Sequence, residues 1–233
     1  RRAALADGMQ ILELGCGWGS LTLWMAAHFP GSRIVAVSNS ASQRRFIENR
    51  CRERGIDNVR VITADMNTFS TDQRFDRIVS VEMFEHMRNW EALLRRIADW
   101  LKTDGRVFIH IFSHKRYAYP FETEGDANWM GRHFFTGGIM PADDLIFQFQ
   151  SDLRVVKHWR ISGIHYHKTA EAWLANMDRR RQAILPVLAA VYGSDGAALW
   201  FQRWRIFFMA CSEVWHHDGG RQWLVSHYLM KAP

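Results

Sequence analysis

The first half of the chain alternates short apolar runs with longer segments in which apolar residues recur at helical spacing. The apolar runs predict buried strands at about 9–14, 33–38, 59–63, 76–81 and 106–112. Helical patterns lie between most of these strands, at about 19–28, 41–54 and 90–101. Strands that alternate with helices form a parallel sheet with helices on both faces. The pattern therefore predicts an α/β fold built on a doubly wound, mostly parallel sheet.

The pattern changes after Ser113. The segment from His114 to Pro141 has no clear period and is rich in aromatic residues and glycines, which is typical of a functional loop. Pro141 is expected to open a short helix, because proline suits the first helical position. Further elements are predicted as a strand at 153–162, helices at 168–191 and 197–215 separated by YGSDG, and an antiparallel edge strand over QWLVSHYLM. We expect seven strands in one domain over 1–233, with helical cap insertions at about 113–150 and 164–218.

Composition narrows the class of partner. The 233 residues include 11 Trp and 15 Phe, which favours a large apolar pocket or a well-packed helical cap. The formal net charge of +6 favours contact with an anionic surface such as phospholipid. The basic residues are scattered, however, and no nucleic-acid-binding module is recognisable. We therefore expect no nucleic acid partner and at most weak contact with a membrane surface, while the oligomeric state stays open.

Cysteine usage and the ends of the chain indicate a compartment. Cys16, Cys51 and Cys211 are odd in number and far apart, which argues against a disulfide framework or a zinc site and for a reducing, cytoplasmic location. The sequence shows neither a membrane span nor a signal peptide. Because the chain begins at Arg1 without methionine and reaches a strand almost at once, we expect that it lacks an original N-terminus.

The stretch MQILELGCGWGS is the most specific motif. A strand ends at Glu13, and Gly15, Gly17 and Gly19 follow at alternate positions before a helix. Glycine is needed where the backbone turns sharply and passes close to a ligand. The pattern differs from a dinucleotide fingerprint and resembles motif I of S-adenosylmethionine (SAM)-dependent methyltransferases. SAM carries a cationic amine and a sulfonium, so an acid such as Glu13 suits it electrostatically.

Two further stretches are candidates for holding the same cofactor. The second strand ends without an acid, but Ser38, Asn39 and Gln43 can donate and accept hydrogen bonds to ribose hydroxyls. After the third strand, Asp65 and Met66 stand where an acid and an apolar residue commonly surround adenine. From the sequence alone, Asp65 is equally typical of a helix cap.

Titratable residues cluster after the fourth predicted strand. The sequence SVEMFEHM places Glu82, Glu85 and His86 within five positions. Parallel strands deliver functional side chains at their carboxyl ends, so these residues are candidates for acid–base chemistry. The residues alone give equal weight to a structural role, in which Glu82 caps a helix and His86 is a satisfied interior histidine.

Several motifs occur in order from end to end: LELGCGWGS, VSNSASQ, DRIVSVEMFEHM, FFTGGIMP, HYHKTAEAW and QWLVSHYLM. Together they resemble the cyclopropane fatty acid synthase superfamily, and most closely its coclaurine N-methyltransferase branch. The resemblance implies a Rossmann-like class I methyltransferase fold, SAM as cofactor and S-adenosylhomocysteine as product. It also implies that Ser38 and Gln43 hold the ribose. Cyclopropane synthases hold a bicarbonate base at positions that match Glu85, His86, His110 and Tyr166, together with a cysteine that would precede Arg1.

Position 82 decides between the branches. Cyclopropane synthases typically carry a small residue there, whereas the amine N-methyltransferases carry glutamate, as here. A carboxylate at that position would repel bicarbonate and attract a cationic amine. We therefore expect N-methylation of a small, aromatic amine, with Glu85 and His86 as the general base pair and Glu82 orienting the ammonium. The alternatives are modification of phospholipid acyl chains and a non-catalytic SAM-binding module.

Aromatic residues of the expected cap are candidates for the acceptor pocket. Trp129, Phe134, Phe135 and Trp223 suit stacking and cation–π contact with a ring-bearing amine, although each alone is more typical of a core. His165, His167, His216 and His217 match no metal-ligand spacing, so we predict no metal.

Overall fold

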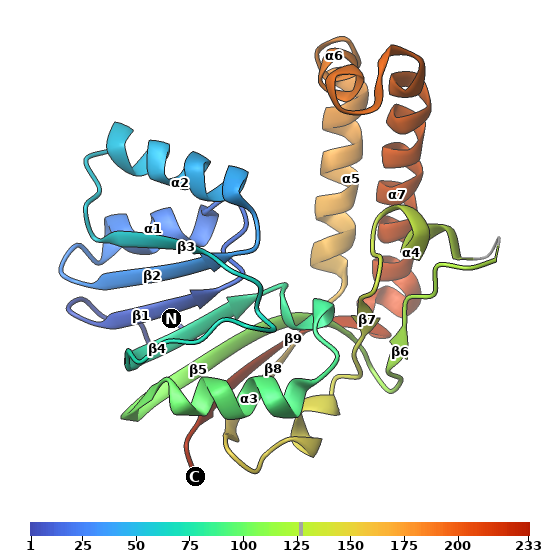
Figure 1. Ribbon diagram of the computed structural model, residues 1–233. Coiled ribbons are helices and arrows are strands. Elements are labelled where there is room, and N and C mark those ends of the chain that lie inside the picture. The colour runs from blue at the N-terminus through green and yellow to red at the C-terminus, as the bar shows by residue number, and fades with distance from the viewer. Residues whose placement is uncertain (126–127) are drawn as a thin grey trace. The chain divides into compact units, whose positions relative to one another are not determined.

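The computed structural model describes residues 1–125 and 128–233 and divides into two compact units, which are treated separately below (Figure 1). The first, here called the sheet unit, comprises residues 1–112, 144–159 and 226–233. The second, here called the helical unit, comprises residues 113–143 and 160–225.

The sheet unit is built on the predicted seven-stranded sheet. The strands are β1 (Gln10–Leu14), β2 (Arg33–Ser38), β3 (Val59–Thr63), β4 (Phe75–Val81), β5 (Leu101–His114), β8 (Arg154–Ser162) and β9 (Trp223–Lys231). Their order is β3-β2-β1-β4-β5-β9-β8, and the pairs from β3 through β5 are parallel. The prediction of a mostly parallel sheet of seven strands is confirmed.

The last strand differs from its prediction in one respect. β9 lies between β5 and β8 rather than at the edge, and β8 is the edge strand. Its antiparallel direction follows from two contacts. The Lys115 N–H donates to the Gln222 carbonyl, and His110, five residues back along the chain, lies beside His227, five residues forward. Because β9 is paired on both sides, its alternating side chains are more buried than those of an edge strand.

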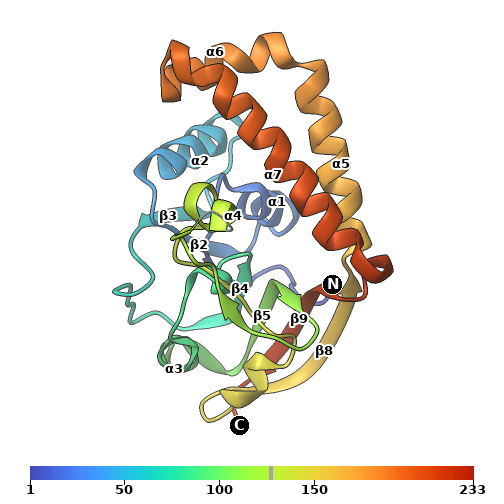
Figure 2. The same ribbon diagram turned by 90° about the vertical axis from the view of Figure 1, so that its right-hand side faces the viewer.

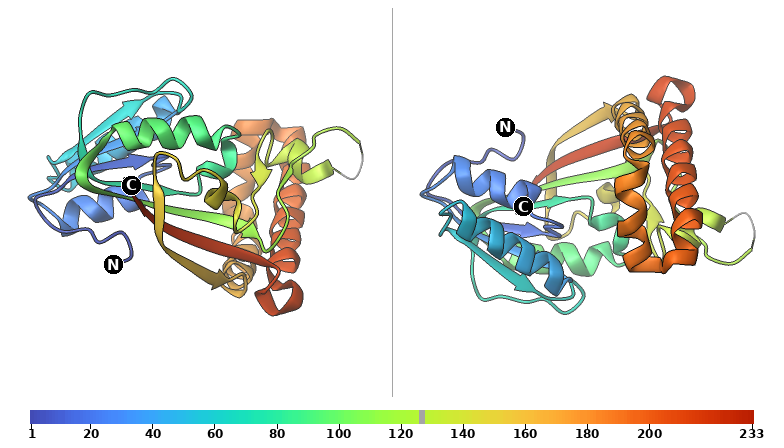
Figure 3. Two further views of the ribbon diagram at one scale, coloured as in Figure 1. Left: turned by 90° about the horizontal axis from the view of Figure 1, so that it is seen from below. Right: turned by 90° about the horizontal axis from the view of Figure 1, so that it is seen from above.

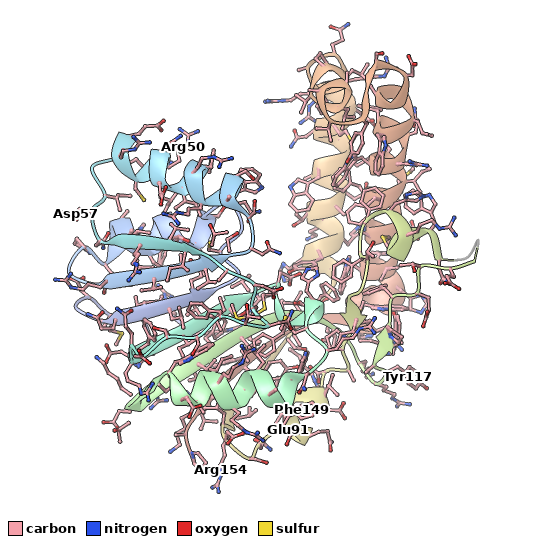
Figure 4. All side chains as sticks on the ribbon, in the orientation of Figure 1. Arg50, Asp57, Glu91, Tyr117, Phe149 and Arg154 are labelled. Carbon is pink, nitrogen blue, oxygen red and sulfur yellow. The ribbon has the colours of Figure 1, made fainter. Side chains whose placement is uncertain are left out.

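Helices cover both faces of this sheet. Helices α1 (Ser20–His28) and α2 (Ala41–Glu53) share a core with β2 and β3, and α3 (Trp90–Asp99) lies on the opposite face (Figure 3). The Asn89 side chain caps α3 by accepting the Ala92 N–H. Glu91 lies in the first turn of α3, where its carboxylate interacts favourably with the positive end of the helix dipole (Figure 4). Short 3-10 turns, η1 (Phe84–His86) and η3 (Leu145–Gln148), complete the unit.

The apolar stripe of α3 shows why the sequence pattern succeeds here. Trp90, Leu93, Leu94 and Ile97 follow helical spacing, and all four are buried. Each such side chain contributes about 1.5–3 kcal/mol when it is fully buried. The helix ends at Asp99, close to the predicted end at about residue 101.

The helical unit contains a small hairpin and four helices in its described residues. Strands β6 (Tyr119–Pro120) and β7 (Ile139–Met140) are antiparallel, and α4 (Trp129–His133) lies between them in sequence. Helices α5 (Ile164–Arg179) and α7 (Ser194–Gly220) run side by side and are joined at one end by α6 (Arg181–Tyr192) (Figures 1 and 2). The core between these three helices is formed by Met177, Leu188, Ala197 and Phe201.

Two expectations for this unit are wrong. Residues 168–191 form two helices rather than one, because the helix breaks at Arg180. The YGSDG break is confirmed but is confined to Gly193, whose φ of 78° ends α6. Pro141 opens no helix; it follows β7, and the Pro141 carbonyl accepts the His114 N–H.

Among residues 1–125 and 128–233, no single helix has the length and apolar character needed to cross a membrane. The bent pair α6 and α7 passes that test by length and composition only.

Candidate active site

The carboxyl ends of four parallel strands meet at one edge of the sheet. Leu14 of β1 pairs with Val37 of β2 and with Ser80 of β4, and Val81 of β4 pairs with His110 of β5. The glycine loop after β1, the Ser38 region after β2 and the acidic segment after β4 are therefore neighbours. This is the edge at which open α/β sheets bind ligands.

The three glycines of the loop all have left-handed backbone angles. The values of φ are 80° at Gly15, 51° at Gly17 and 81° at Gly19. A Cβ on Gly15 would lie 2.7 Å from Met83 Cγ, and one on Gly19 would lie 2.6 Å from Ile47 Cγ1. No atom of the described residues lies within 4 Å of a Cβ built on Gly17. Gly15 and Gly19 are thus required by packing, whereas a Cβ on Gly17 would meet open space.

Glu13 lies behind this loop rather than at its rim. Its side chain is 3% exposed, and one carboxyl oxygen accepts a 2.5 Å hydrogen bond from the Thr22 hydroxyl of α1. Burial raises the pKa of Glu13 to about 8, with the Thr22 hydrogen bond acting in the opposite direction. The carboxyl is therefore largely protonated at neutral pH. The sequence suggested an ionised Glu13 that faces the cofactor, whereas the structure buries this carboxyl and joins it to Thr22.

Ser38 and Gln43 come together as expected. The Ser38 hydroxyl donates to Gln43 Oε1 over 2.6 Å, and Asn39 beside them is exposed. Asp65 Oδ1 accepts hydrogen bonds from both nitrogens of Asn67, so it closes a local turn and caps no helix. Met66 is buried, as an apolar residue beside adenine would be.

Glu82 has an unusual backbone conformation. Its φ is 53°, in the left-handed region that costs a residue with a side chain about 1–2 kcal/mol. The Glu82 N–H donates to the His110 carbonyl, and Glu82 Oε1 lies 3.0 Å from His110 Nε2. The side chain remains 35% exposed. A strained backbone that presents a partly exposed carboxylate indicates a functional residue.

Glu85 follows one turn later and is completely buried. Glu85 Oε1 accepts the Phe112 N–H over 2.8 Å, whereas Oε2 has no hydrogen-bond partner among the described residues. Burial and then the nearby Glu82 carboxylate raise the pKa of Glu85 well above its usual value. Glu85 therefore ionises less readily than an ordinary carboxyl.

His86 is exposed at the end of the same turn. Burial of part of its ring lowers the pKa of His86, with Glu82 acting in the opposite direction, so the imidazole is neutral at pH 7. The structural alternative for this segment is not observed, because Met83 rather than Glu82 precedes the 3-10 turn and His86 is not interior.

The aromatic candidates belong to the helical unit and lie in several clusters. Phe134 packs against Trp129 and, at 4.4 Å between ring centroids, against Phe207 of α7. Phe135 contacts Phe121, and Tyr166 contacts Trp215. Trp223 packs against His114, and its indole N–H donates to the Tyr119 hydroxyl. The sequence did not single out Phe207, which a helical aromatic stripe would have indicated.

One residue of the sheet unit, His227, was not predicted from the sequence to belong to the site. His227 of β9 places its Nε2 2.9 Å from His110 Nδ1 and so extends the Glu82–His110 contact. A histidine inside a strand of apolar residues was the available signal. Among the described residues there is no group of three or more histidine, cysteine or acidic side chains that could hold a metal ion.

Comparison with known proteins identifies the family. The model of the family described as mycolic acid cyclopropane synthetase matches residues 1–221. The chain belongs to this family. The resemblance to the cyclopropane fatty acid synthase superfamily is therefore confirmed, and so is the likeness to its coclaurine N-methyltransferase branch.

Curated relatives include an (S)-coclaurine N-methyltransferase from Thalictrum flavum subsp. glaucum. It is 39% identical over 99% of this chain and 65% of its own length. The cyclopropane-fatty-acyl-phospholipid synthase of Escherichia coli is 32% identical over 72% of this chain and 42% of its own. The chain thus spans about 65% of the length of the first of these relatives.

Solved structures confirm the class I methyltransferase fold. A crystal structure of coclaurine N-methyltransferase bound to N-methylheliamine and SAH superposes with a TM-score of 0.94 at 38% identity, covering 99% of this chain and 69% of that one. The mycolic acid cyclopropane synthase CmaA1 gives a TM-score of 0.79 at 20% identity, covering 98% and 80%, and supports the fold alone.

Proposed function

We propose that the protein is a methyltransferase that transfers a methyl group from SAM to the nitrogen of a small, benzylisoquinoline-like amine and releases S-adenosylhomocysteine. The observation that carries the proposal is Glu82, a strained and partly exposed carboxylate held by His110 beside the glycine loop. The acceptor class is supported by relatives named (S)-coclaurine N-methyltransferase and pavine N-methyltransferase, at 39% and 34% identity.

The glycine loop and its neighbours fit SAM. The open side of Gly17 leaves room for the methionine part, and the uncharged Ser38–Gln43 pair can bind ribose hydroxyls. Asn39, Asp65 and Met66 would complete the nucleoside site. Glu13 would act from behind the loop, by joining β1 to α1 through Thr22. When bound, SAM supplies an electrophilic methyl group on a sulfonium.

The acidic segment fits a cationic acceptor. An alkylamine is protonated at pH 7 and must lose that proton before its nitrogen can react. The Glu82 carboxylate attracts the ammonium and orients it. His86 is neutral and can take the proton, whereas burial disfavours the ionised form that Glu85 would need to act as the base. The electrostatics therefore favour His86 over Glu85 as the proton acceptor of the expected base pair. The protonated Glu85 would donate a hydrogen bond from Oε2.

Aromatic side chains of the helical unit are proposed to hold the ring system of the acceptor. The cluster around Phe134, with Trp129 and Phe207, offers faces for stacking and cation–π contact. Phe135, Tyr166 and Trp223 remain candidates for the same pocket. A cytoplasmic location and weak contact with anionic membranes also remain predictions, the first from the cysteines and the second from the net charge.

Transfer of labelled methyl groups tests the proposal. The protein is incubated with methyl-labelled SAM and either a tetrahydroisoquinoline amine or vesicles of unsaturated phospholipid, and SAM binding is titrated by calorimetry in parallel. We expect label in the amine. Label in lipid alone would instead support acyl-chain modification, which the family description and the Glu85, His86 and His110 positions favour as the second candidate. Binding of SAM without any transfer would overturn both and support a binding module.

A further inference from the structure

A chain of four polar side chains leads away from the candidate base cluster within the sheet unit. Glu82 Oε1 lies 3.0 Å from His110 Nε2, and His110 Nδ1 lies 2.9 Å from His227 Nε2. On the far side of the second ring, His227 Nδ1 lies 2.7 Å from a guanidinium nitrogen of Arg2. The chain therefore connects the strained residue after β4 with β5, β9 and the segment before β1.

The direction of every hydrogen bond in this chain follows from Arg2. A guanidinium has only donors, so His227 Nδ1 must accept and the single ring proton of His227 sits on Nε2. That proton is donated to His110 Nδ1, which leaves the His110 proton on Nε2, where it is donated to Glu82. Both rings are neutral in this arrangement, with a cation at one end and an anion at the other.

The surroundings hold Arg2 and His227 in place. The Arg2 guanidinium lies 5.1 Å from the ring centroid of Trp159 on β8. The His227 ring meets Phe108 edge-on at 5.2 Å and the His110 ring at 4.6 Å. Burial, His110 and Arg2 lower the pKa of His227 to about 3, which agrees with a neutral ring.

We infer that His227, oriented by Arg2, is a positioning residue that fixes His110 in its Nε2–H form and so preserves the full negative charge of Glu82 for the acceptor ammonium. The physical reason is competition. A doubly protonated His110 would form an ion pair with Glu82, and that pair would have to be broken or shared when a cationic amine arrives. The inference rests on the proposed function for its consequence, but the hydrogen-bond order itself does not.

The order is tested in the ligand-free protein by ¹⁵N NMR of histidine-labelled wild type and His227→Phe. The wild type should show His110 protonated on Nε2 alone. Phenylalanine keeps the packing against Phe108 but donates nothing, so His110 Nδ1 loses the His227 proton and the His110 signal should depart from the Nε2–H pattern. His227→Gln should restore the wild-type signal, because its amide can donate to His110 and accept from Arg2.

Steady-state kinetics test the consequence. In His227→Phe, KM for the amine should rise about tenfold, as the loss of roughly one hydrogen bond's worth of free energy implies. The kcat and the affinity for SAM should stay within about threefold of wild type. The matched control is His158→Phe, which keeps the stacking on Tyr228 in the same unit and should change neither signal nor KM.

The outcomes separate the two proposals. The inference is overturned if His110 carries its proton on Nδ1 in the wild type. It is also overturned if His227→Phe changes neither the His110 signal nor KM for the amine. If no amine is methylated, the proposed function fails while NMR still decides the hydrogen-bond order. Should His227→Phe fail to fold, Arg2→Met removes the donor that sets the order while keeping a long side chain near Trp159. The two tautomers of His227 should then exchange, and unchanged single-tautomer signals would overturn the inference.

Discussion

The ends of β1 and β4 lie side by side, and both are followed by residues with a left-handed backbone conformation. The side chains at these positions differ, however. After β1, three glycines adopt positive φ, where the missing side chain makes space and removes the steric cost. After β4, Glu82 adopts positive φ and keeps its side chain at a cost. The first end is built for a ligand that needs room, and the second for a ligand that needs a charge.

The buried carboxyls at the two ends differ in the same way. Glu13 and Glu85 both have raised pKa values because they are buried. Glu13 is joined to Thr22, whereas Glu85 Oε2 has no hydrogen-bond partner among the described residues. A satisfied buried acid supports the fold, while one with an unsatisfied oxygen is suited to meet a ligand.

Among substitutions at the two strand ends, Glu85→Ala should have the largest effect on turnover. We expect turnover to fall by roughly a hundredfold or more, because the carboxyl proposed to donate a hydrogen bond from Oε2 beside the reacting groups is lost, with SAM affinity nearly unchanged. Alanine also removes the hydrogen bond that Glu85 Oε1 accepts from the buried Phe112 N–H, which lowers stability. Single-turnover kinetics and SAM titration provide the measurement.

Glu85→Gln separates the two effects of the alanine variant. Glutamine keeps the acceptor for Phe112 and resembles the protonated acid, so we expect it to recover at least about tenfold of the lost turnover. Equal losses in both variants would mean that Glu85 itself takes the proton.

Glu82→Gln should have the next largest effect, and this effect should be on binding of the amine. Removal of a charge that pairs with the ammonium is expected to raise KM by about tenfold to hundredfold, with a smaller change in kcat. Glu82→Gly should raise KM similarly, but it also removes the backbone strain at this position. Urea unfolding should show the glycine variant to be more stable than the glutamine variant; the reverse order would deny that strain is stored there.

Gly17→Ala tests the other end of the comparison. Alanine at φ 51° should cost about 1 kcal/mol of stability and, because its Cβ enters the open side of the loop, weaken SAM binding by about tenfold. Gly55→Ala is the matched control, since its φ of 62° and open surroundings impose the same strain at the end of α2. Equal SAM affinities in the two variants would contradict a ligand at Gly17.

Glu13→Gln should have the smallest effect on activity, and its effect on stability should be visible only as a change with pH. The pKa of Glu13 is raised from 4.5 to about 8 on folding, so its contribution to stability is complete below about pH 4.5 and is lost as pH rises through 8. Glutamine still accepts from Thr22 and cannot ionise. Urea unfolding at pH 5 and pH 8 should therefore show the wild type losing more stability than the variant, by a few kcal/mol on the order of the pKa shift. If the wild type and the variant lost the same amount of stability between pH 5 and pH 8, a buried and protonated Glu13 would be contradicted.

The sheet unit was predictable because its signals are local. Buried parallel strands read as continuous apolar runs, α3 shows its stripe at Trp90, Leu93, Leu94 and Ile97, and positive φ selects glycine in the loop. The pairing of Ser38 with Gln43 also follows from short-range spacing. These features depend on neighbours within one element or one turn.

The remainder depends on contacts between distant residues. The position of β9 inside the sheet is set by pairing with β5 and β8, which its own alternation does not encode. The break at Arg180 interrupts a segment whose helical propensity is continuous. The raised pKa of Glu85 arises from burial by the whole unit, and the contact between His227 and His110 joins residues 117 positions apart.

The three cysteines have a practical consequence for experiments on this protein. All are free, and burial raises the pKa of the Cys16 and Cys211 thiols to about 12 and that of Cys51 above its usual value. Thiolates, not thiols, react with maleimides, so the native cysteines should label slowly at pH 7. A fluorophore or spin label attached to one newly introduced surface cysteine would then report on either unit without replacing any native residue.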